Sequence, residues 1–220
     1  MGRSRSFAGA AALAFALITA VAATTSESGA NQTFITEAQP TSPAGARSIA
    51  VGKPTRGSLI FSVQLAAEGP DFFTWDFPRR TSPNRAWRRW GTDTALMRTL
   101  TVIAEHRAAN PGAPRAGIAD VSRRSGGPFG KRFGGLGHAS HQNGLDVDVL
   151  YPRRDHQEAV APVAKLIDRR LSQDLLDRFV AAGARYAFVG RRTKLKGPKK
   201  IVQRIPHHDD HIHVRWRPGR

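Results

Sequence analysis

Strict alternation of apolar and polar positions predicts short β-strands in the second half of the chain. LDVDVL (145–150) and HIHVRW (211–216) alternate throughout, and this period of two places successive side chains on opposite faces of a strand. Runs that are rich in apolar and β-branched residues predict further strands at 57–65, 115–122 and 185–189. Five short strands at irregular spacing therefore form the β part of the expected fold.

Helical spacing of apolar residues predicts a helix that begins at Thr92 or Asp93, either of which can cap it. Asn-Pro-Gly at 110–112 ends this helix. Further helical segments are predicted at 158–170 and 173–182. Ser172 is the expected cap of the second segment, and Gly183 is its expected end. Helices mixed with irregularly spaced strands predict an α+β fold rather than a repeated βαβ unit.

The N-terminal segment predicts an exported protein. Two arginines precede an uncharged apolar run at 7–23, which ends in the small residues Ala20-Val21-Ala22 and is typical of a cleaved signal peptide. An uncleaved anchor is the alternative, because the run nearly reaches the shortest spanning length of about 17 residues. The stretch 24–46 is rich in Thr, Ser, Ala and Pro and predicts a flexible linker. The folded domain is then expected at 47–217, with no membrane span after cleavage.

Composition adds a strong positive charge and the absence of cysteine. Lys and Arg number 34 against 17 Asp and Glu, a formal net charge of +17, which favours an anionic partner. No cysteine is present, so disulfides, thiolate ligands and a cysteine nucleophile are excluded. Arginines interleaved with tryptophans at 75–90 are also found in proteins that bind single-stranded nucleic acid. For an exported chain no nucleic acid partner is expected, which leaves retention on an anionic cell wall or a merely solvated surface.

Six of the eight histidines fall into two compact groups. The first group lies in GHASHQNGLDVDV (137–149) and the second in HHDDHIH (207–213). On the predicted strands, His211 and His213 share one face, and Asp146 and Asp148 share one face, while the intervening apolar residues point to the other side. Each group thus joins a strand that has one polar and one apolar face.

Placed side by side, these strands offer His141, Asp148 and His213 as three ligands for one metal ion per chain. Three protein ligands with an open fourth position are typical of catalytic zinc, whereas structural zinc sites usually have four closed ligands. Two histidines and a carboxylate also suit non-haem iron(II), but an exported protein favours zinc, which has no redox chemistry. Solvated polar faces with no metal are the remaining alternative.

The same residues carry a family resemblance. His141-x6-Asp148 followed by His211-Ile-His213 resembles the pattern of the lysostaphin, D-Ala-D-Ala metallopeptidase and sonic hedgehog superfamily. GHASHQNGLDVDV and the segment from His208 to Arg215 resemble, more narrowly, the penicillin-insensitive murein endopeptidases. A weaker likeness runs from about residue 48 to residue 217. The resemblance implies a single α+β domain with a small, mostly antiparallel sheet flanked by helices, as in hedgehog and DD-peptidase domains.

The resemblance also implies a function. It implies Zn²⁺ held by His141, Asp148 and His213, a peptidoglycan substrate, and hydrolysis of the D-alanyl to meso-diaminopimelyl crosslink. A secreted or periplasmic, wall-associated enzyme follows, and the oligomeric state is not predicted. Two other hypotheses stay open. One is a non-catalytic zinc-containing wall-binding domain of the same fold, and the other is an exported anion-binding protein with incidental histidines.

Neither histidine group contains a glutamate, so histidine is the available general base. His211 is the first candidate because it shares a strand face with His213. His208, for which the resemblance also implies a role, is the second, as acid to the leaving amine or as donor to the oxyanion. Three further candidates each have a less specific alternative. Asp146 orients a ligand imidazole or is a surface carboxylate. Arg215 meets a substrate carboxylate or merely flanks the strand, and His138 contacts the site or is a loop imidazole.

Overall fold

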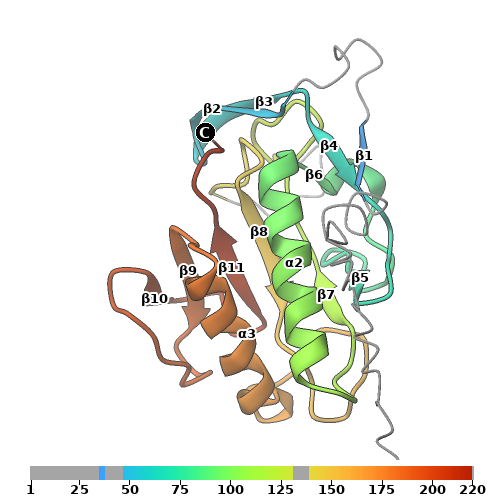
Figure 1. The fold of residues 1–220 in the computed structure, drawn as a ribbon, viewed down its shortest axis with the longest axis vertical. Helices are drawn as coiled ribbons and strands as arrows, with labels where there is room; N and C mark the ends of the chain where they lie inside the picture. Colours follow the sequence, from blue (N-terminus) through green and yellow to red (C-terminus); the bar gives the residue numbers. More distant parts are fainter. Residues whose placement is uncertain (1–34, 38–46, 131–138, 220) are drawn as a thin grey trace, which may run out of the picture.

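The computed structural model describes residues 35–37, 47–130 and 139–219 (Figure 1). The predicted signal peptide at 1–23 and the candidate residue His138 lie outside the described residues. Within the range predicted as a linker, Ile35–Glu37 forms strand β1, which pairs antiparallel with β4 (Val63–Leu65). None of the helices in the described part of the chain has the length and apolar character needed to cross a bilayer.

A six-stranded sheet forms the centre of the fold, in the order β10-β9-β11-β8-β7-β5. The three inner pairs are antiparallel, whereas β10–β9 and β5–β7 at the two edges are parallel. Its strands are β5 (Phe72–Thr74), β7 (Ala116–Ile118), β8 (Asp146–Leu150), β9 (Tyr186–Gly190), β10 (Val202–Ile205) and β11 (His211–Arg215). The expected α+β class with a mostly antiparallel sheet is confirmed.

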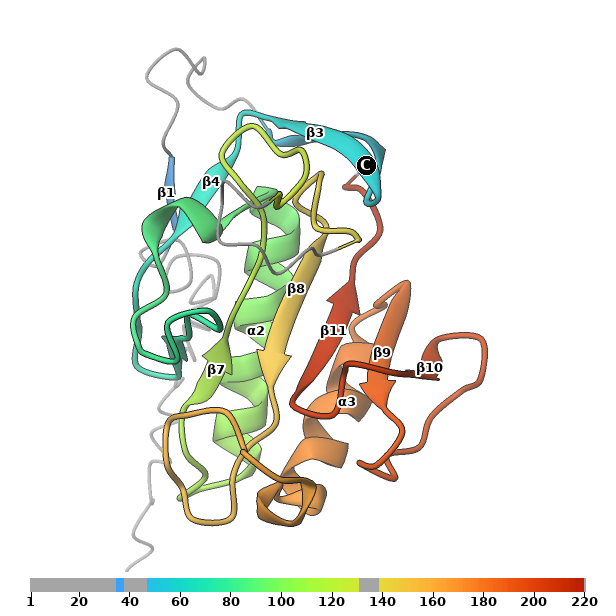
Figure 2. The ribbon, with the colours of Figure 1, turned by 180° about the vertical axis from the view of Figure 1, so that it is seen from behind.

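Both long helices cover the same face of this sheet. Helices α2 (Asp93–Ala109) and α3 (Arg169–Ala181) lie in front of the sheet in Figure 1 and behind it in Figure 2. The apolar residues of the two central strands, Val147 and Val149 on β8 and Ile212 and Val214 on β11, are fully buried in the same cluster as the apolar residues of α2 and α3. Because strand side chains alternate, the polar residues of both strands are left on the opposite face.

Smaller elements surround the sheet. Strands β2 (Ile49–Lys53) and β3 (Arg56–Ile60) form a hairpin, and β4 also pairs with β6 (Trp90–Gly91). The single strand predicted at 57–65 is wrong: it is divided into β3 and β4 at Phe61, whose φ of 50° is incompatible with extended backbone. Two short 3₁₀ helices, η1 (Ala86–Arg88) and η3 (Ala164–Leu166), complete the described elements.

The helix predictions are partly confirmed. The Thr92 hydroxyl accepts a hydrogen bond from the Ala95 N–H at 3.1 Å and caps α2 as expected. Helix α3 is capped instead by Asp168, which accepts from the Leu171 N–H at 2.9 Å, and Ser172 lies in the first turn. The helix predicted at 158–170 is wrong, since up to residue 168 this segment contains only η3, and α3 begins at Arg169. Pro162 lacks an N–H and disfavours helical backbone in the preceding residue, which explains this difference.

Candidate metal centre

Strands β8 and β11 are hydrogen-bonded neighbours, and their register builds the centre of the site. His213 lies opposite Asp148, and Arg215 lies opposite Asp146. His211 shares the face of His213, because the two are separated by one residue on the same strand. The register therefore places the polar residues of both strands on the sheet face away from the helices, as the alternation predicts.

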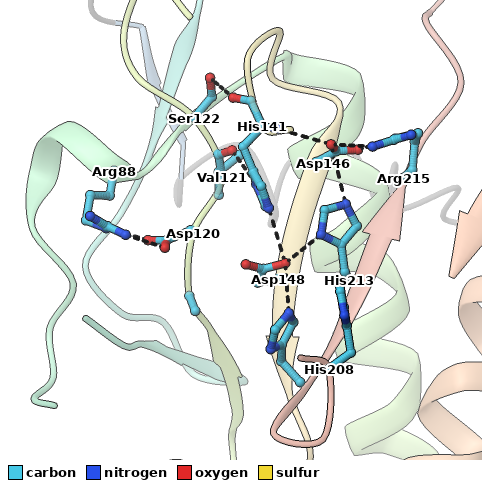
Figure 3. A network of polar contacts seen from close by, with 12 residues as sticks. Arg88, Asp120, Val121, Ser122, His141, Asp146, Asp148, His208, His213 and Arg215 are labelled. Atoms are coloured by element: carbon cyan, nitrogen blue, oxygen red, sulfur yellow. Dashed lines mark hydrogen bonds and ion pairs between the residues drawn. The ribbon is translucent and has the colours of Figure 1, made fainter. Parts of the chain in front are cut away.

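The third residue of the site, His141, lies in the loop that precedes β8. His141 Nε2 lies 3.3 Å from Asp148 Oδ1, and His213 Nδ1 lies 3.1 Å from the same oxygen (Figure 3). One side-chain nitrogen or oxygen from each of the three residues falls within 4.8 Å of the others, and all three side chains are buried. The structure thus brings together the three residues that the sequence predicts as metal ligands.

Hydrogen bonding fixes which atoms face the centre. His141 Nδ1 lies 2.8 Å from the carbonyl oxygen of Val121. A carbonyl only accepts, so Nδ1 carries the proton and Nε2 presents its lone pair to Asp148. Both oxygens of Asp148 are fully buried, and ring nitrogens of His141 and His213 meet its Oδ1. Acceptor groups that converge in a buried place need a cation, and the set of two imidazoles and one carboxylate fits a metal ion such as zinc.

The charges of the centre also suit a cation. Burial by itself would raise the pKa of Asp148, but the neighbouring His141 and His211 outweigh it and hold that pKa well below the usual value. Burial would lower the pKa of His213, but the carboxylates of Asp146 and Asp148 raise it to about 9. In the metal-free protein His213 therefore carries a proton that balances the two carboxylates, and a metal ion must displace this proton.

Asp146 contacts both His141 and His213. Its carboxylate accepts two hydrogen bonds from the Arg215 guanidinium, at 2.7 and 2.9 Å, and one from the backbone N–H of His141 at 3.1 Å. Its Oδ2 also lies 3.4 Å from His213 Nε2. Asp146 is fully buried, which excludes the surface-carboxylate alternative. Arg215 is thus paired within the protein, and its contact with a substrate carboxylate stays a prediction.

His211 and His208 lie beside the three central residues. His211 Nδ1 is 2.7 Å from Asp210 Oδ1, and its Nε2 is 3.5 Å from Asp148 Oδ1. His208 Nδ1 is 2.7 Å from the Pro206 carbonyl, and its ring centroid is 4.9 Å from that of His211. Each Nδ1 therefore donates, which leaves each Nε2 as an acceptor when the ring is neutral. Burial is the main cause that lowers the pKa of His208 to about 4, so this ring is neutral at pH 7.

The segment after β7 positions His141 and Asp148, a role that the sequence does not reveal. The backbone N–H of Asp148 donates to the Asp120 carbonyl at 2.9 Å, and the Ser122 hydroxyl donates to the His141 carbonyl at 2.6 Å. Asp120 is itself held by a buried ion pair with Arg88 (Figure 3). Asp120, a charged residue inside the mostly apolar stretch 115–122, is the sign of this role that the sequence offers. Asp210 is a further residue that the sequence does not single out, and its carboxylate contacts His211 Nδ1 at 2.7 Å.

The centre opens into a cavity of about 560 Å³. His141, His211 and His213 border this cavity, and Phe77 and Phe188 supply apolar walls. The Phe188 ring lies 5.3 Å from the His213 ring, centroid to centroid. A peptide-sized ligand therefore has access to the buried polar atoms of the centre.

Comparison with known proteins agrees with this geometry. A family model described as penicillin-insensitive murein endopeptidase matches residues 50–176. The matched range includes His141 and Asp148 but ends within α3, so the histidines of β11 lie outside it. Their place in the centre rests on the pairing of β11 with β8. No curated protein matches the chain.

Proposed function

Since the chain belongs to the penicillin-insensitive murein endopeptidase family, whose members hydrolyse peptidoglycan, we propose that it is an exported zinc peptidase. Its proposed reaction is hydrolysis of peptide crosslinks of the D-alanyl to meso-diaminopimelyl type. The observation that carries the proposal is the buried convergence of Asp148 with His141 Nε2 and His213 Nδ1 below an open cavity.

The three central residues would hold one zinc ion. Zinc at this position supplies Lewis acidity, which lowers the pKa of a water molecule to about 7 and polarises the scissile carbonyl. His141 is preset for this role because Val121 fixes its tautomer. His213 and His141 are both oriented by Asp146, and such supporting contacts sharpen the binding of a metal ion.

His211 is the proposed general base. Its Nε2 faces the centre as an acceptor, while the Asp210 carboxylate accepts a hydrogen bond from Nδ1–H. Asp210 thereby stabilises the imidazolium that forms when Nε2 takes a proton. His208 is the proposed partner for the leaving amine or the oxyanion. Because its Nδ1 already donates to Pro206, His208 must first gain a proton at Nε2 before it can donate to either.

The proposed location is the secreted or periplasmic space. The signal peptide at 1–23, the linker at 24–46 and the catalytic domain at 47–217 remain the proposed organisation. The net charge of +17 supports retention on an anionic wall. No nucleic acid partner is proposed.

A defined crosslinked muropeptide dimer tests the proposal. The zinc-loaded protein should release monomers, a chelator should stop the release, and added zinc should restore it, with mass spectrometry identifying the bond cut. Asp148→Asn is the control, since it removes a ligand charge from the centre. Intact dimers after incubation with protein that holds stoichiometric zinc would contradict the proposal and favour a non-catalytic wall-binding domain.

A further inference from the structure

A second, larger cavity adjoins the candidate metal centre. Its volume is about 740 Å³, and it shares Phe77, His207 and Asp210 with the lining of the first cavity. The aromatic ring of Phe77 packs edge-on against His211, with ring centroids 5.5 Å apart. The second cavity therefore begins next to the proposed general base and extends away from it.

The walls of this cavity combine apolar and cationic side chains. Trp75, Val160 and Val163 contribute apolar surface, and Val163 is 47% exposed. Three arginines, Arg80, Arg153 and Arg192, also line it. An exposed apolar surface with positive charge at its border suits a ligand that has small apolar groups and a free carboxylate.

The three arginines are not equivalent. Arg153 is engaged by the Asp155 carboxylate through its Nε at 2.8 Å and through a second hydrogen bond, and it also donates to the Val160 carbonyl at 3.0 Å. Arg192 Nε lies 3.8 Å from Asp209 Oδ2. Among the residues that the structure describes, no acidic side chain pairs with Arg80. Arg80 is therefore the lining cation whose charge is open to a ligand.

The backbone at Arg80 is fixed by a tight turn. The Arg80 N–H donates to the Asp76 carbonyl at 2.7 Å, and the Asp76 N–H donates to the Thr81 carbonyl at 2.8 Å. Arg80 has a φ of 53°, a conformation that favours glycine or asparagine over residues with long side chains. The turn conformation therefore gives no local reason for an arginine, whereas the position at the cavity border gives one.

We propose that the second cavity binds the part of a crosslinked stem peptide that continues beyond the scissile bond, and that Arg80 pairs with a free carboxylate on it. The inference rests on the proposed function. A crosslink extends on both sides of the bond that is cut, so a peptide seated in the first cavity must continue over the adjoining surface. The small side chains of such a peptide match the apolar wall, and its carboxylates match the unpaired guanidinium.

Arg80→Gln and Arg79→Gln form a matched pair of variants. Both residues are exposed and lie in the same turn, but only Arg80 lines the cavity. Each variant is assayed with a muropeptide dimer whose carboxylates are free and with the same dimer amidated. A single exposed charge-assisted contact predicts that Arg80→Gln raises KM about fivefold on the free dimer. We expect kcat to stay within about twofold, because the contact is equally present in the ground state and the transition state.

The remaining arms make the result specific. On the amidated dimer Arg80→Gln should equal the unmodified protein, Arg79→Gln should equal it on both substrates, and Arg80→Lys should recover part of the loss. Equal behaviour of the Arg80 and Arg79 variants, or a loss at Arg80 that does not depend on the carboxylate, overturns the inference. If the unmodified protein cuts neither dimer, the proposed function fails instead. In that case calorimetry measures the affinity of each variant for the two uncut dimers. The inference then requires that Arg80→Gln weakens binding of the free dimer and leaves binding of the amidated dimer unchanged.

Discussion

His211 differs from the proposed ligand His141 in the group that its Nδ1 contacts, which is a carboxylate rather than a backbone carbonyl. Its Nδ1 donates to Asp210, and its Nε2 faces the centre at 3.5 Å from Asp148. We predict that His211→Ala lowers kcat about 10²- to 10⁴-fold, the usual contribution of a general base, while stoichiometric zinc is retained. Turnover of muropeptide dimers and metal content measured on the same preparation check both parts. His156→Ala, at an exposed histidine outside the site, is the matched control and should change neither.

Loss of zinc together with activity would contradict this assignment. His208, His211 and His213 also have side-chain nitrogens within 4.8 Å of one another. A variant at His211 that no longer holds zinc would therefore place the ion in this second group. Retained activity with retained zinc would instead remove His211 as the base.

The protonation of His213 leads to a prediction for metal affinity. Its pKa is raised to about 9, mainly by Asp146 against the opposing effect of burial, so below that pH zinc must displace one proton. We expect zinc affinity to fall by about tenfold for each pH unit between pH 8 and pH 6. Zinc titration against a competing chelator at several pH values measures this slope. An affinity that does not change over this range would show that His213 binds no proton that competes with the metal.

At the scale of elements, Asp174 links the two helices that cover the sheet. On α3 it accepts a hydrogen bond from Arg178 Nε at 2.8 Å, and from α2 it meets His106 Nδ1 at 2.6 Å and Asn110 Nδ2 at 3.0 Å. Burial would raise the pKa of Asp174, but these partners outweigh it and lower the pKa to about 2. The carboxylate thus stabilises the packing of α2 against α3 while it is ionised.

We predict that Asp174→Asn lowers the free energy of unfolding by about 2 kcal/mol at pH 7, since hydrogen bonds to a charged group are weakened. The stabilisation is complete above the ordinary pKa of 3.8 and is lost as the pH falls toward 2, so the difference between the two proteins should shrink over that range. Thermal unfolding at several pH values measures it. Asp177→Asn, at an exposed position on the same helix, is the control. A difference that is constant with pH would contradict the ionic contribution.

The elements also show which parts of the fold a sequence pattern predicts. Strands β8 and β11 are predicted correctly because apolar and polar residues alternate along their whole length. The apolar residues face the core and the polar residues face the site, so the same alternation identifies the candidate ligands. The sequence pattern does not predict strand β10, because its pairing with β9 is a tertiary effect. The buried Arg88–Asp120 pair was missed for the same reason, since its partners are 32 residues apart.

At the scale of the whole molecule, the two faces of the central sheet have different roles, one in packing the core and one in forming the candidate site. Its helix-covered face holds the main apolar cluster, and its other face holds the candidate metal centre between β8 and β11. Each central strand therefore contributes alternate residues to the core and to the site. A slip of the register by one residue would turn His213 and Asp148 toward the helices. Burial of the valines and Ile212 thus fixes the geometry of the proposed ligands.

Part of the positive charge of the molecule lies on a segment outside the central strands β8 and β11. We call residues 191–200 the cationic segment; it joins β9 to the edge strand β10 (Figure 1). Its lysines are exposed, namely Lys194, Lys196, Lys199 and Lys200. Because they do not line the cavity of the metal centre, they can contribute to retention on an anionic wall without taking part in turnover.

We predict that replacing the four lysines by glutamine weakens binding to insoluble peptidoglycan about tenfold, if each exposed charge contributes about 0.35 kcal/mol. Cosedimentation should show that the difference disappears as added salt screens the charges, while cleavage of a soluble dimer stays unchanged. The four-fold lysine to arginine variant keeps the charge and should bind as the unmodified protein does. Equal binding by the glutamine variant at low salt would assign wall retention to other cations, and slower cleavage of the soluble dimer would place the cationic segment within reach of the substrate.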